Sequence, residues 1–388
     1  MSEPALHHAP VVIIGGGFGG LYSALALSSI DNHPPILLIE PKERFIFFPL
    51  IYELLSGELR TWEVAPKYKK LFAGREIAWL QDSVTAIDMD SKFVTTALGQ
   101  CQEFGQLVIA TGTRLETFGT PGVREHAMTF HSLSDIERLQ QLLKFARESP
   151  DLKQKLVIVG AGPTGVELAC KLADLAEGSI EIELIEQSDQ LLKSARAFNR
   201  EQAQIALLKR NVTSKIKTKV LKVNNGSILT IGPNSIEETI STVGVIWTAG
   251  ISPSFPIISP PPTIDNRGRL VCSEKLQLLP YEDIFVIGDI GSGPNPLPMT
   301  AQVAFQQAEL LCTNLISQRE GLPLSTFRWK DLGEMVSLGV DNATLVSSGL
   351  TLAGSSAFQI RRLAYLARLP GLSHQLRAAT GWLLSERY

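Results

Sequence analysis

Short runs of consecutive apolar residues recur along the chain, and two of them lead directly into glycine-rich turns. Val11 to Ile14 is entirely apolar, and so is Leu156 to Val159. A short apolar run beside such a turn predicts a strand buried on both faces of a parallel sheet. A mostly apolar helical stretch follows each turn, LYSALALSS in the first case and VELACKLADLA in the second. The repeated pattern predicts two similar α/β units.

Each turn has the spacing G-x-G-x-x-G, and each is followed by a second apolar strand that ends in an acid. Glu40 lies 20 residues after the first turn and Glu186 lies 21 residues after the second. Such glycines permit a tight turn, let a pyrophosphate approach and let the helix pack on the strand, while the acid binds a ribose. The alternative is that both turns only join a strand to a helix. The glycines are Gly15, Gly17 and Gly20, then Gly160, Gly162 and Gly165.

Two dinucleotide sites in one chain suggest hydride transfer between two carriers, most simply from a nicotinamide to a flavin. We expect the first turn to hold FAD and the second to hold NAD(P)H. Glu186 favours NADH, because a carboxylate repels the 2′-phosphate of NADPH. Gln187 and Lys193 weaken that preference, so the choice between the two nicotinamides stays open.

Composition limits the kinds of acceptor that can receive electrons from the flavin. The net charge of −3 gives no sign of nucleic-acid binding, and the scattered cysteines 101, 170, 272 and 312 form no C-x-x-C pair. We therefore expect no disulfide framework and no metal site. The stretch GGFGGLYSALALSS lacks the cysteine pair that disulfide reductases need. The flavin must pass its electrons directly to a diffusible acceptor.

Three further strand ends complete a layout that resembles the two-dinucleotide-binding flavoproteins. They are QLVIATGT at 106–113, VIWTAG at 245–250 and DIFVIGDIG at 283–291. The resemblance implies that Ala110, Thr111 and Gly112 close the first domain and that Gly250 ends the matching element of the second. It also implies that Asp289 binds the ribityl or phosphate part of the flavin. A helix or turn cap is the alternative role for Asp289.

The expected fold is therefore α/β, with two Rossmann-like dinucleotide-binding domains and a C-terminal amphipathic helical segment. We expect the FAD domain at 1–115 and 245–325, with the NAD(P)H domain at 116–244 inserted into it. The C-terminal region, 326–388, carries the amphipathic helices from about residue 357.

The sequence TAQVAFQQA, which begins at Thr300, resembles a motif of the type II NAD(P)H:quinone oxidoreductases. FIFFPLIYELLSGE and GPTGVELA resemble this family too, and the similarity covers essentially the whole chain. The family implies a single-subunit FAD enzyme that oxidises NAD(P)H and reduces a membrane quinone without pumping protons. It also implies catalytic roles for Glu167, at the nicotinamide–quinone junction, and for Gln302, near a quinone carbonyl, with Gln302 and Val303 beside the flavin.

The segment YELLSGELRTWEVAP, at 52–66, is similar to the cyanobacterial and plastid branch of that family. This branch includes demethylphylloquinone reductases of vitamin K1 synthesis, which are associated with NADPH. One departure is Phe48-Pro49, where many members have Thr-Pro. The acceptor implied is a membrane naphthoquinone or plastoquinone, demethylphylloquinone included.

The tail from Ala357 to Tyr388 is basic and has leucines and a tryptophan at roughly helical spacing. The tail contains one acid, Glu386, and five arginines, so its net charge is five minus one, or +4. The arginines are at 361, 362, 368, 377 and 387. Pro370-Gly371 divides it into two helices. Basic amphipathic helices are typical of membrane-surface segments. We expect a peripheral membrane protein on a cytoplasmic or stromal face, at the thylakoid or plasma membrane. The alternative is that the tail packs on the protein or on a second copy in a homodimer.

Two other functions remain open on the sequence alone. One is a flavin-linked reductase of an iron–sulfur protein, which requires an exposed docking surface for its acceptor. The other is a nucleotide-sensing flavoprotein with little turnover.

Overall fold

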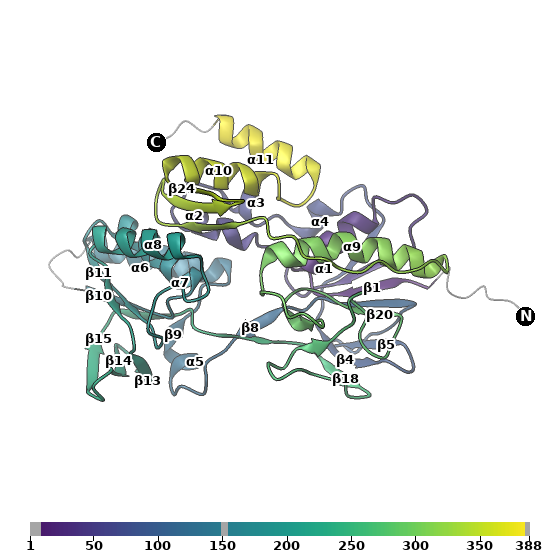
Figure 1. Ribbon diagram of the computed structural model, residues 1–388, viewed down its shortest axis with the longest axis horizontal. Coiled ribbons are helices and arrows are strands. Elements are labelled where there is room, and N and C mark those ends of the chain that lie inside the picture. The colour runs from purple at the N-terminus through teal and green to yellow at the C-terminus, as the bar shows by residue number, and fades with distance from the viewer. Residues whose placement is uncertain (1–8, 149–153, 385–388) are drawn as a thin grey trace, which may run out of the picture.

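Two five-stranded parallel sheets lie side by side at the centre of the molecule, and helices cover them (Figure 1). The computed structural model describes residues 9–148 and 154–384 of the chain. The α/β class and the two units predicted from the glycine turns are confirmed. The limits of the domains remain a prediction.

The first sheet, on the right in Figure 1, has the order β20-β7-β1-β2-β3, and all its pairings are parallel. Its last strand in the chain, β20, pairs with β7 although the whole second sheet lies between them in the sequence. The strands are β1 (Val11–Ile14), β2 (Ile36–Ile39), β3 (Ile77–Leu80), β7 (Gln106–Ile109) and β20 (Ile284–Val286).

The second sheet repeats this design with the order β12-β11-β10-β16-β9, again entirely parallel. In each sheet the strand before the glycine turn is central, with the acid-bearing strand as its neighbour. The strands are β9 (Ala127–Met128), β10 (Gln154–Val159), β11 (Ile180–Ile185), β12 (Thr213–Lys215) and β16 (Gly244–Trp247).

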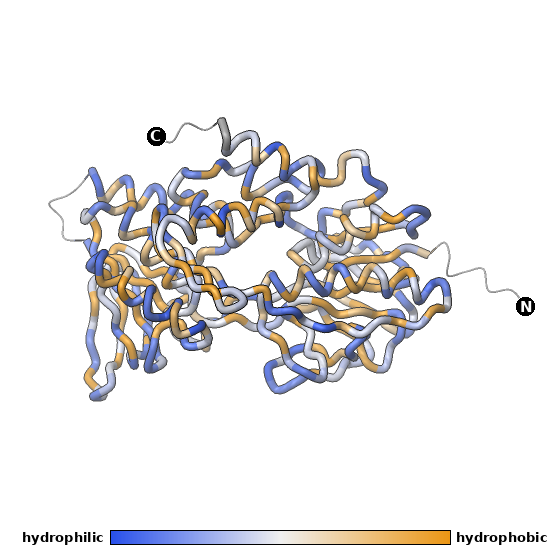
Figure 2. Tube along the Cα trace, turned by 45° about the horizontal axis from the view of Figure 1, so that its top comes forward, coloured by the Kyte–Doolittle hydropathy of each residue, from blue (hydrophilic) through white to orange (hydrophobic). Residues whose placement is uncertain are grey.

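Apolar runs form these strands because both faces of each sheet are covered. In β1, Val11 and Ile13 pack into one hydrophobic cluster, whereas Val12 and Ile14 pack into another on the opposite face. Side chains alternate between faces along a strand, so a strand covered on both faces has no polar position. Figure 2 shows the resulting apolar colour along the strands of both sheets.

Five longer helices flank the sheets, and each glycine turn leads into one of them. Helices α1 and α9 lie beside one another on the first sheet (Figure 1). The helices are α1 (Phe18–Leu27), α6 (Leu133–Glu148), α7 (Pro163–Ala176), α8 (Ala197–Lys209) and α9 (Ala301–Arg319).

The chain passes between the two sheets through an antiparallel pair, β8 (Thr113–Leu115) and β17 (Ile251–Pro253). Two small sheets flank the large ones, β18-β4-β5-β6 and β13-β14-β15. In the latter, the Asn-Asn-Gly turn at 224–226 joins β13 to β14 in a hairpin. Their strands are β4 (Val84–Asp88), β5 (Phe93–Thr96), β6 (Cys101–Glu103), β13 (Lys219–Asn224), β14 (Ser227–Ile231), β15 (Glu237–Ser241) and β18 (Ile257–Ser259). The shorter elements are η1 (Phe48–Leu50), α2 (Ile51–Leu55), α3 (Thr61–Val64), α4 (Tyr68–Leu71), α5 (Val123–His126), β19 (Leu270–Val271), η2 (Gly288–Ile290) and β21 (Gly291–Ser292).

The C-terminal region adds a three-stranded antiparallel sheet and two helices above α2 and α3 (Figure 1). The division at Pro370-Gly371 is confirmed, because it separates α10 from α11. Within the described part of the chain, no helix combines the length and apolar character needed to cross a bilayer. The elements are β22 (Glu334–Ser337), β23 (Ala343–Ser347), β24 (Leu350–Gly354), α10 (Ser355–Leu366) and α11 (Leu372–Leu384).

The expectation that the tail arginines form a basic surface is wrong for Arg361, which is only 1% exposed. The other described arginines also lie against aromatic rings of the protein: Arg362 over Trp382, Arg368 over Phe305 and Arg377 over Trp62. Arg387 and Glu386 lie outside the described residues. The tail therefore packs on the protein through its arginines, while several of its leucines face outward.

Candidate active site

The first glycine turn lies between the carboxyl end of β1 and the N-terminus of α1. Gly15 has a φ of 95°, and a Cβ there would lie 2.5 Å from the carbonyl oxygen of Ala110. A Cβ at Gly20 would overlap the carbonyl oxygen of Gly15, so the helix packs directly on the turn. A Cβ at Gly17 would meet nothing within 4 Å. The turn is thus tight at both ends and open in the middle, where a pyrophosphate has access to helix N–H groups.

The second turn reproduces this geometry. Gly160 has a φ of 100°, and a Cβ there would lie 2.8 Å from the Cα of Ala249. A Cβ at Gly165 would overlap the Gly160 carbonyl oxygen, while a Cβ at Gly162 would meet nothing within 4 Å. The chain therefore contains two glycine turns of the same construction.

The acids at the ends of β2 and β11 are held in the same way. The Glu40 carboxylate accepts hydrogen bonds from the backbone N–H of Gly16, at 2.7 Å, and of Lys42, at 2.9 Å. The Glu186 carboxylate accepts them from Ala161 and Ser188, both at 2.7 Å. Each acid thus lies beside its own glycine turn, with oxygen lone pairs left for ribose hydroxyls.

The two Thr/Gly elements also occupy equivalent places. Ala110 and Thr111 lie against Gly15, and Gly112 follows with a φ of 70°. In the other unit, Thr248 donates from Oγ1 to the Gly160 carbonyl at 2.9 Å, and Gly250 follows with a φ of 75°. Each element lies against the glycine turn of its own unit.

Asp289 lies at the carboxyl end of β20, at the sheet edge that β7 and β1 share. Among the described residues, none donates a hydrogen bond to its carboxylate. Burial raises the pKa of Asp289 to about 6, and no neighbouring charge opposes this shift. A desolvated carboxylate without a donor is costly in a folded protein. A ligand hydroxyl at this position removes that cost, which favours a binding role over a cap.

These features test the first site against FAD. Gly17 leaves the space for a pyrophosphate, Glu40 is placed for a ribose, and Asp289 is an acceptor that needs a donor. The residues fit the group, since FAD has an adenosine ribose, a pyrophosphate and a ribityl chain of hydroxyls.

The two units meet at Glu167 of α7. Its Oε1 accepts a hydrogen bond from the backbone N–H of Ser337 at 2.7 Å, and Tyr52 of α2 donates its hydroxyl to the same carboxylate. Burial raises the pKa of Glu167, whereas the charge of Arg361 and the two hydrogen bonds oppose the rise. A carboxyl group in such surroundings holds a proton more readily than an ordinary glutamate does.

Arg361 and Glu53 complete this junction, and the sequence did not suggest a role for either. Both side chains are 1% exposed, and the guanidinium forms an ion pair with Glu53 and donates to the carbonyl of Pro49. The departure at Phe48-Pro49 therefore adjoins a buried cation, and the Phe48 ring lies 5.9 Å from that of His131. The available signal was Glu53 itself, an acid inside the apolar run FIFFPLIYELL.

Gln302 lies in the first turn of α9, but its carboxamide already has partners. Its Oε1 accepts from Leu332 N at 3.1 Å and its Nε2 donates to the Gly333 carbonyl at 3.2 Å. Gln306, one turn later, binds both backbone groups of Lys330 in the same way. The carboxamides of the two glutamines thus pair with backbone N–H and C=O groups of the 330–333 segment, as the backbone of a neighbouring strand does. One N–H of Gln302 is left for a substrate carbonyl.

The remaining candidates lie within the same helices. Val303 is buried in α9, and its N–H is capped by Thr300 Oγ1 at 3.3 Å. Cys170 and Cys312 are buried in α7 and α9, and burial raises the pKa of each thiol to about 12. These two thiols pack in the core.

Comparison with known proteins agrees with this geometry. Residues 9–308 match the family described as pyridine nucleotide-disulphide oxidoreductase. The chain is 36% identical to the demethylphylloquinone reductase NdbB of Synechocystis sp., over 96% of the chain and 95% of that protein. It is 33% identical to the alternative NAD(P)H-ubiquinone oxidoreductase C1 of Arabidopsis thaliana, over 96% of the chain and 80% of that protein.

The fold is also found among solved structures. NDH2 from Plasmodium falciparum in complex with NADH superimposes with a TM-score of 0.86, at 18% identity and with 97% of each chain covered. At this identity the likeness concerns the fold alone.

Proposed function

The chain belongs to the pyridine nucleotide-disulphide oxidoreductase family, within its type II NAD(P)H:quinone oxidoreductase branch, and from this premise we propose its reaction. NAD(P)H, a proton and a quinone give NAD(P)⁺ and a quinol, and the protein uses FAD. We propose a membrane naphthoquinone as the acceptor, with demethylphylloquinone as the specific candidate. The similarity to a demethylphylloquinone reductase at 36% identity supports this choice.

The observation that carries the proposal is the junction at Glu167. Helix α7 of the second unit and helix α2 of the first meet there, and the buried carboxyl between these helices belongs to α7, which begins at the second glycine turn. When bound, FAD supplies the two-electron carrier between nicotinamide and quinone. Glu167 holds the proton that a quinone oxygen requires, and Tyr52 and Ser337 N fix the orientation of its carboxyl group. The charge of the Arg361 guanidinium opposes the rise in the pKa of Glu167.

Other groups bind the cofactor and the two substrates. Glu40 and Asp289 accept hydrogen bonds from ribose and ribityl hydroxyls, and the N-termini of α1 and α7 bind the pyrophosphates. The free N–H of Gln302 donates to a quinone carbonyl. The rings of Phe18, Tyr22 and Phe305 pack together beside this helix, with centroids 4.3 to 6.3 Å apart, and form an apolar wall suited to a quinone.

We also propose that the protein binds, through α10 and α11, the surface of the membrane in which its quinone substrate dissolves. Leu363, Leu372 and Leu376 are 60–67% exposed there. Exposed leucines on adjacent helices are typical of segments that enter the lipid headgroup region. We propose the cytoplasmic or stromal face of that membrane.

The test is steady-state turnover of the FAD-loaded protein, with NADH and NADPH crossed against naphthoquinones, plastoquinone and ubiquinone analogues. We expect naphthoquinones to give the highest turnover. Glu167→Gln should slow quinone reduction about 100-fold, the usual contribution of a positioned acid. Bleaching of the flavin by the nicotinamide should persist. Glu177→Gln, at the exposed end of the same helix, is the matched control.

Gln302→Ala separates the second role. It should slow quinone reduction more than Gln306→Ala, which removes an equivalent contact to the 330–333 segment. Equal effects of the two substitutions would leave Gln302 with a structural role only. Wild-type rates in Glu167→Gln would remove Glu167 from the mechanism.

A further inference from the structure

The loop after β11 lies where the adenosine ribose of the nicotinamide binds, and its acid alone does not determine the choice of nicotinamide. Both Glu186 oxygens accept backbone hydrogen bonds, from Ala161 N and Ser188 N. The carboxylate is therefore fixed against the glycine turn. The residues that follow it surround the position that a 2′-substituent of the ribose would take.

The turn after β12 is attached to this loop by three backbone hydrogen bonds. Glu186 N donates to the Lys215 carbonyl, Thr218 N donates to the Glu186 carbonyl, and Lys217 N donates to the Ser188 carbonyl, each at 2.9 Å. Lys217 has a φ of 53°, a left-handed conformation that few residues other than glycine adopt. These contacts hold the backbone of Lys217 directly beside Ser188.

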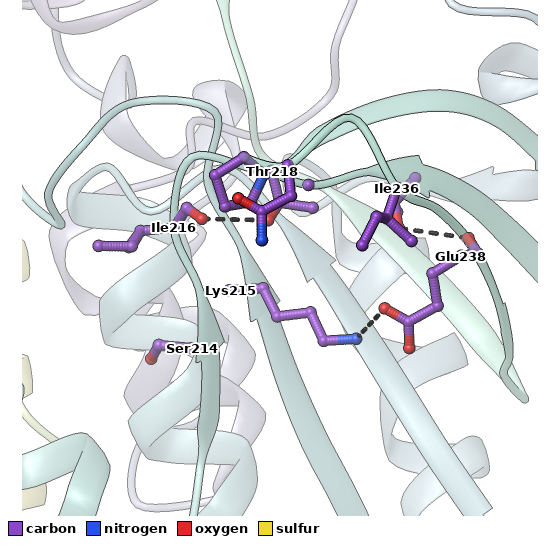
Figure 3. A pocket seen from close by; sticks show the side chains of 10 residues that line it. Ser214, Lys215, Ile216, Thr218, Ile236 and Glu238 are labelled. Atoms are coloured by element: carbon purple, nitrogen blue, oxygen red, sulfur yellow. Dashed lines mark hydrogen bonds and ion pairs between the residues drawn. The ribbon is translucent and has the colours of Figure 1, made fainter.

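The lysines near this loop differ in their availability. Lys215 lies in a shallow pocket of about 380 Å³, and its ammonium is bound to Glu238 at 2.7 Å (Figure 3). It also binds Glu183 at 3.0 Å. Lys193 makes only a loose pair with Asp189, at 3.7 Å, and both side chains are more than 60% exposed. Among the described residues, Lys217 is exposed and has no ion-pair partner.

We propose that Lys217, assisted by Lys193, forms a subsite for the 2′-phosphate of NADPH at the Ser188 turn. The inference rests on the proposed function, because its ligand is the proposed nicotinamide substrate. A 2′-phosphate carries close to two negative charges, so Lys193 forms a stronger ion pair with it than with Asp189. Glu186 serves the ribose of NADH and Lys217 offsets its repulsion of NADPH. The protein thus accepts both nicotinamides.

The test compares two probes that differ only in the 2′-phosphate, 2′,5′-ADP and 5′-AMP, by calorimetry on the FAD-loaded protein. Lys217→Ala should weaken 2′,5′-ADP about fivefold, the upper range for one exposed ion pair, and leave 5′-AMP unchanged. Adding Lys193→Ala should weaken it further, and raising the salt concentration should reduce both effects. Glu186→Gln should strengthen 2′,5′-ADP and weaken 5′-AMP. Lys222→Ala, an exposed lysine on β13, is the matched control.

Equal affinities for 2′,5′-ADP in the wild type, Lys217→Ala and the double variant would overturn the subsite. Failure of 2′,5′-ADP to bind where 5′-AMP binds would do the same, even if NADH reduces quinone. Lysine-dependent binding of 2′,5′-ADP supports the subsite whatever the turnover is. Absence of quinone reduction with either nicotinamide would instead refute the proposed function and leave the subsite standing.

Discussion

Arg361 is the residue whose environment differs most from its sequence pattern. Along the chain it belongs to a basic tail, yet its guanidinium is buried between Glu53, the Pro49 carbonyl and the Tyr365 ring, 4.9 Å away. Burial of two charges is tolerated because each compensates the other. Composition counts a charge but does not identify its partner, since Glu53 and Arg361 are 308 positions apart.

Removing one member of this pair should therefore cost much more than removing a neighbouring arginine. We expect Arg361→Met to lower the free energy of unfolding by about 3–5 kcal/mol, because it leaves Glu53 buried without a partner. Arg362→Met loses only a contact with Trp382, worth about 1 kcal/mol. Urea unfolding curves measure both. Similar losses in the two variants would contradict the assigned role of the pair.

Asp289 gives a prediction about pH in the protein stripped of FAD. Its pKa in the folded state, about 6, lies above the unfolded value near 3.9. Its contribution to stability is therefore complete below pH 4 and is lost as the pH rises through 6. The loss is at most about 3 kcal/mol. Asp289→Asn should abolish this dependence and raise the melting temperature above pH 6. If the melting temperatures of the wild type and of Asp289→Asn change by the same amount from pH 4 to 7, the prediction is wrong.

At the scale of elements, the sequence identified both glycine turns, their strands and helices, and the two tail helices. These elements follow from local patterns of apolar, glycine and proline residues. The direction in which α10 and α11 face was not evident, because both their arginines and their leucines recur at helical spacing. Ala357, Phe358 and Arg361 face the protein, whereas Leu363 faces outward.

The outward leucines are where the membrane proposal is tested. Replacing Leu363, Leu372 and Leu376 together by serine should reduce co-sedimentation with anionic lipid vesicles about tenfold or more, because each buried leucine contributes about 1.5–3 kcal/mol. The melting temperature should change little. The matched control replaces Leu98, Leu208 and Ile257, which are 74–77% exposed elsewhere. Unchanged vesicle binding would refute the proposal. A dimer that dissociates in the triple variant would show that a second copy covers this surface.

At the scale of the whole molecule, two copies of one design are joined by the β8–β17 pair and closed by the C-terminal region (Figure 1). The candidate cofactor-binding acids, Glu40, Asp289 and Glu186, each follow the carboxyl end of a strand in a parallel sheet. Their positions could be predicted because a glycine turn and an acid have a set place in such a sheet. The junction between the copies could not, since Tyr52, Glu167, Ser337 and Arg361 come from four distant segments.

The sequence by itself determined what depends on neighbours along the chain: strand and helix periodicity, glycine turns, and the acids that follow them. Only the tertiary structure decided which charges are buried, which amides of α9 are already bonded, and which groups surround the carboxyl of Glu167. The physical reason is range. Backbone geometry and side-chain alternation act over a few residues, whereas burial and ion pairing depend on groups that only folding brings together.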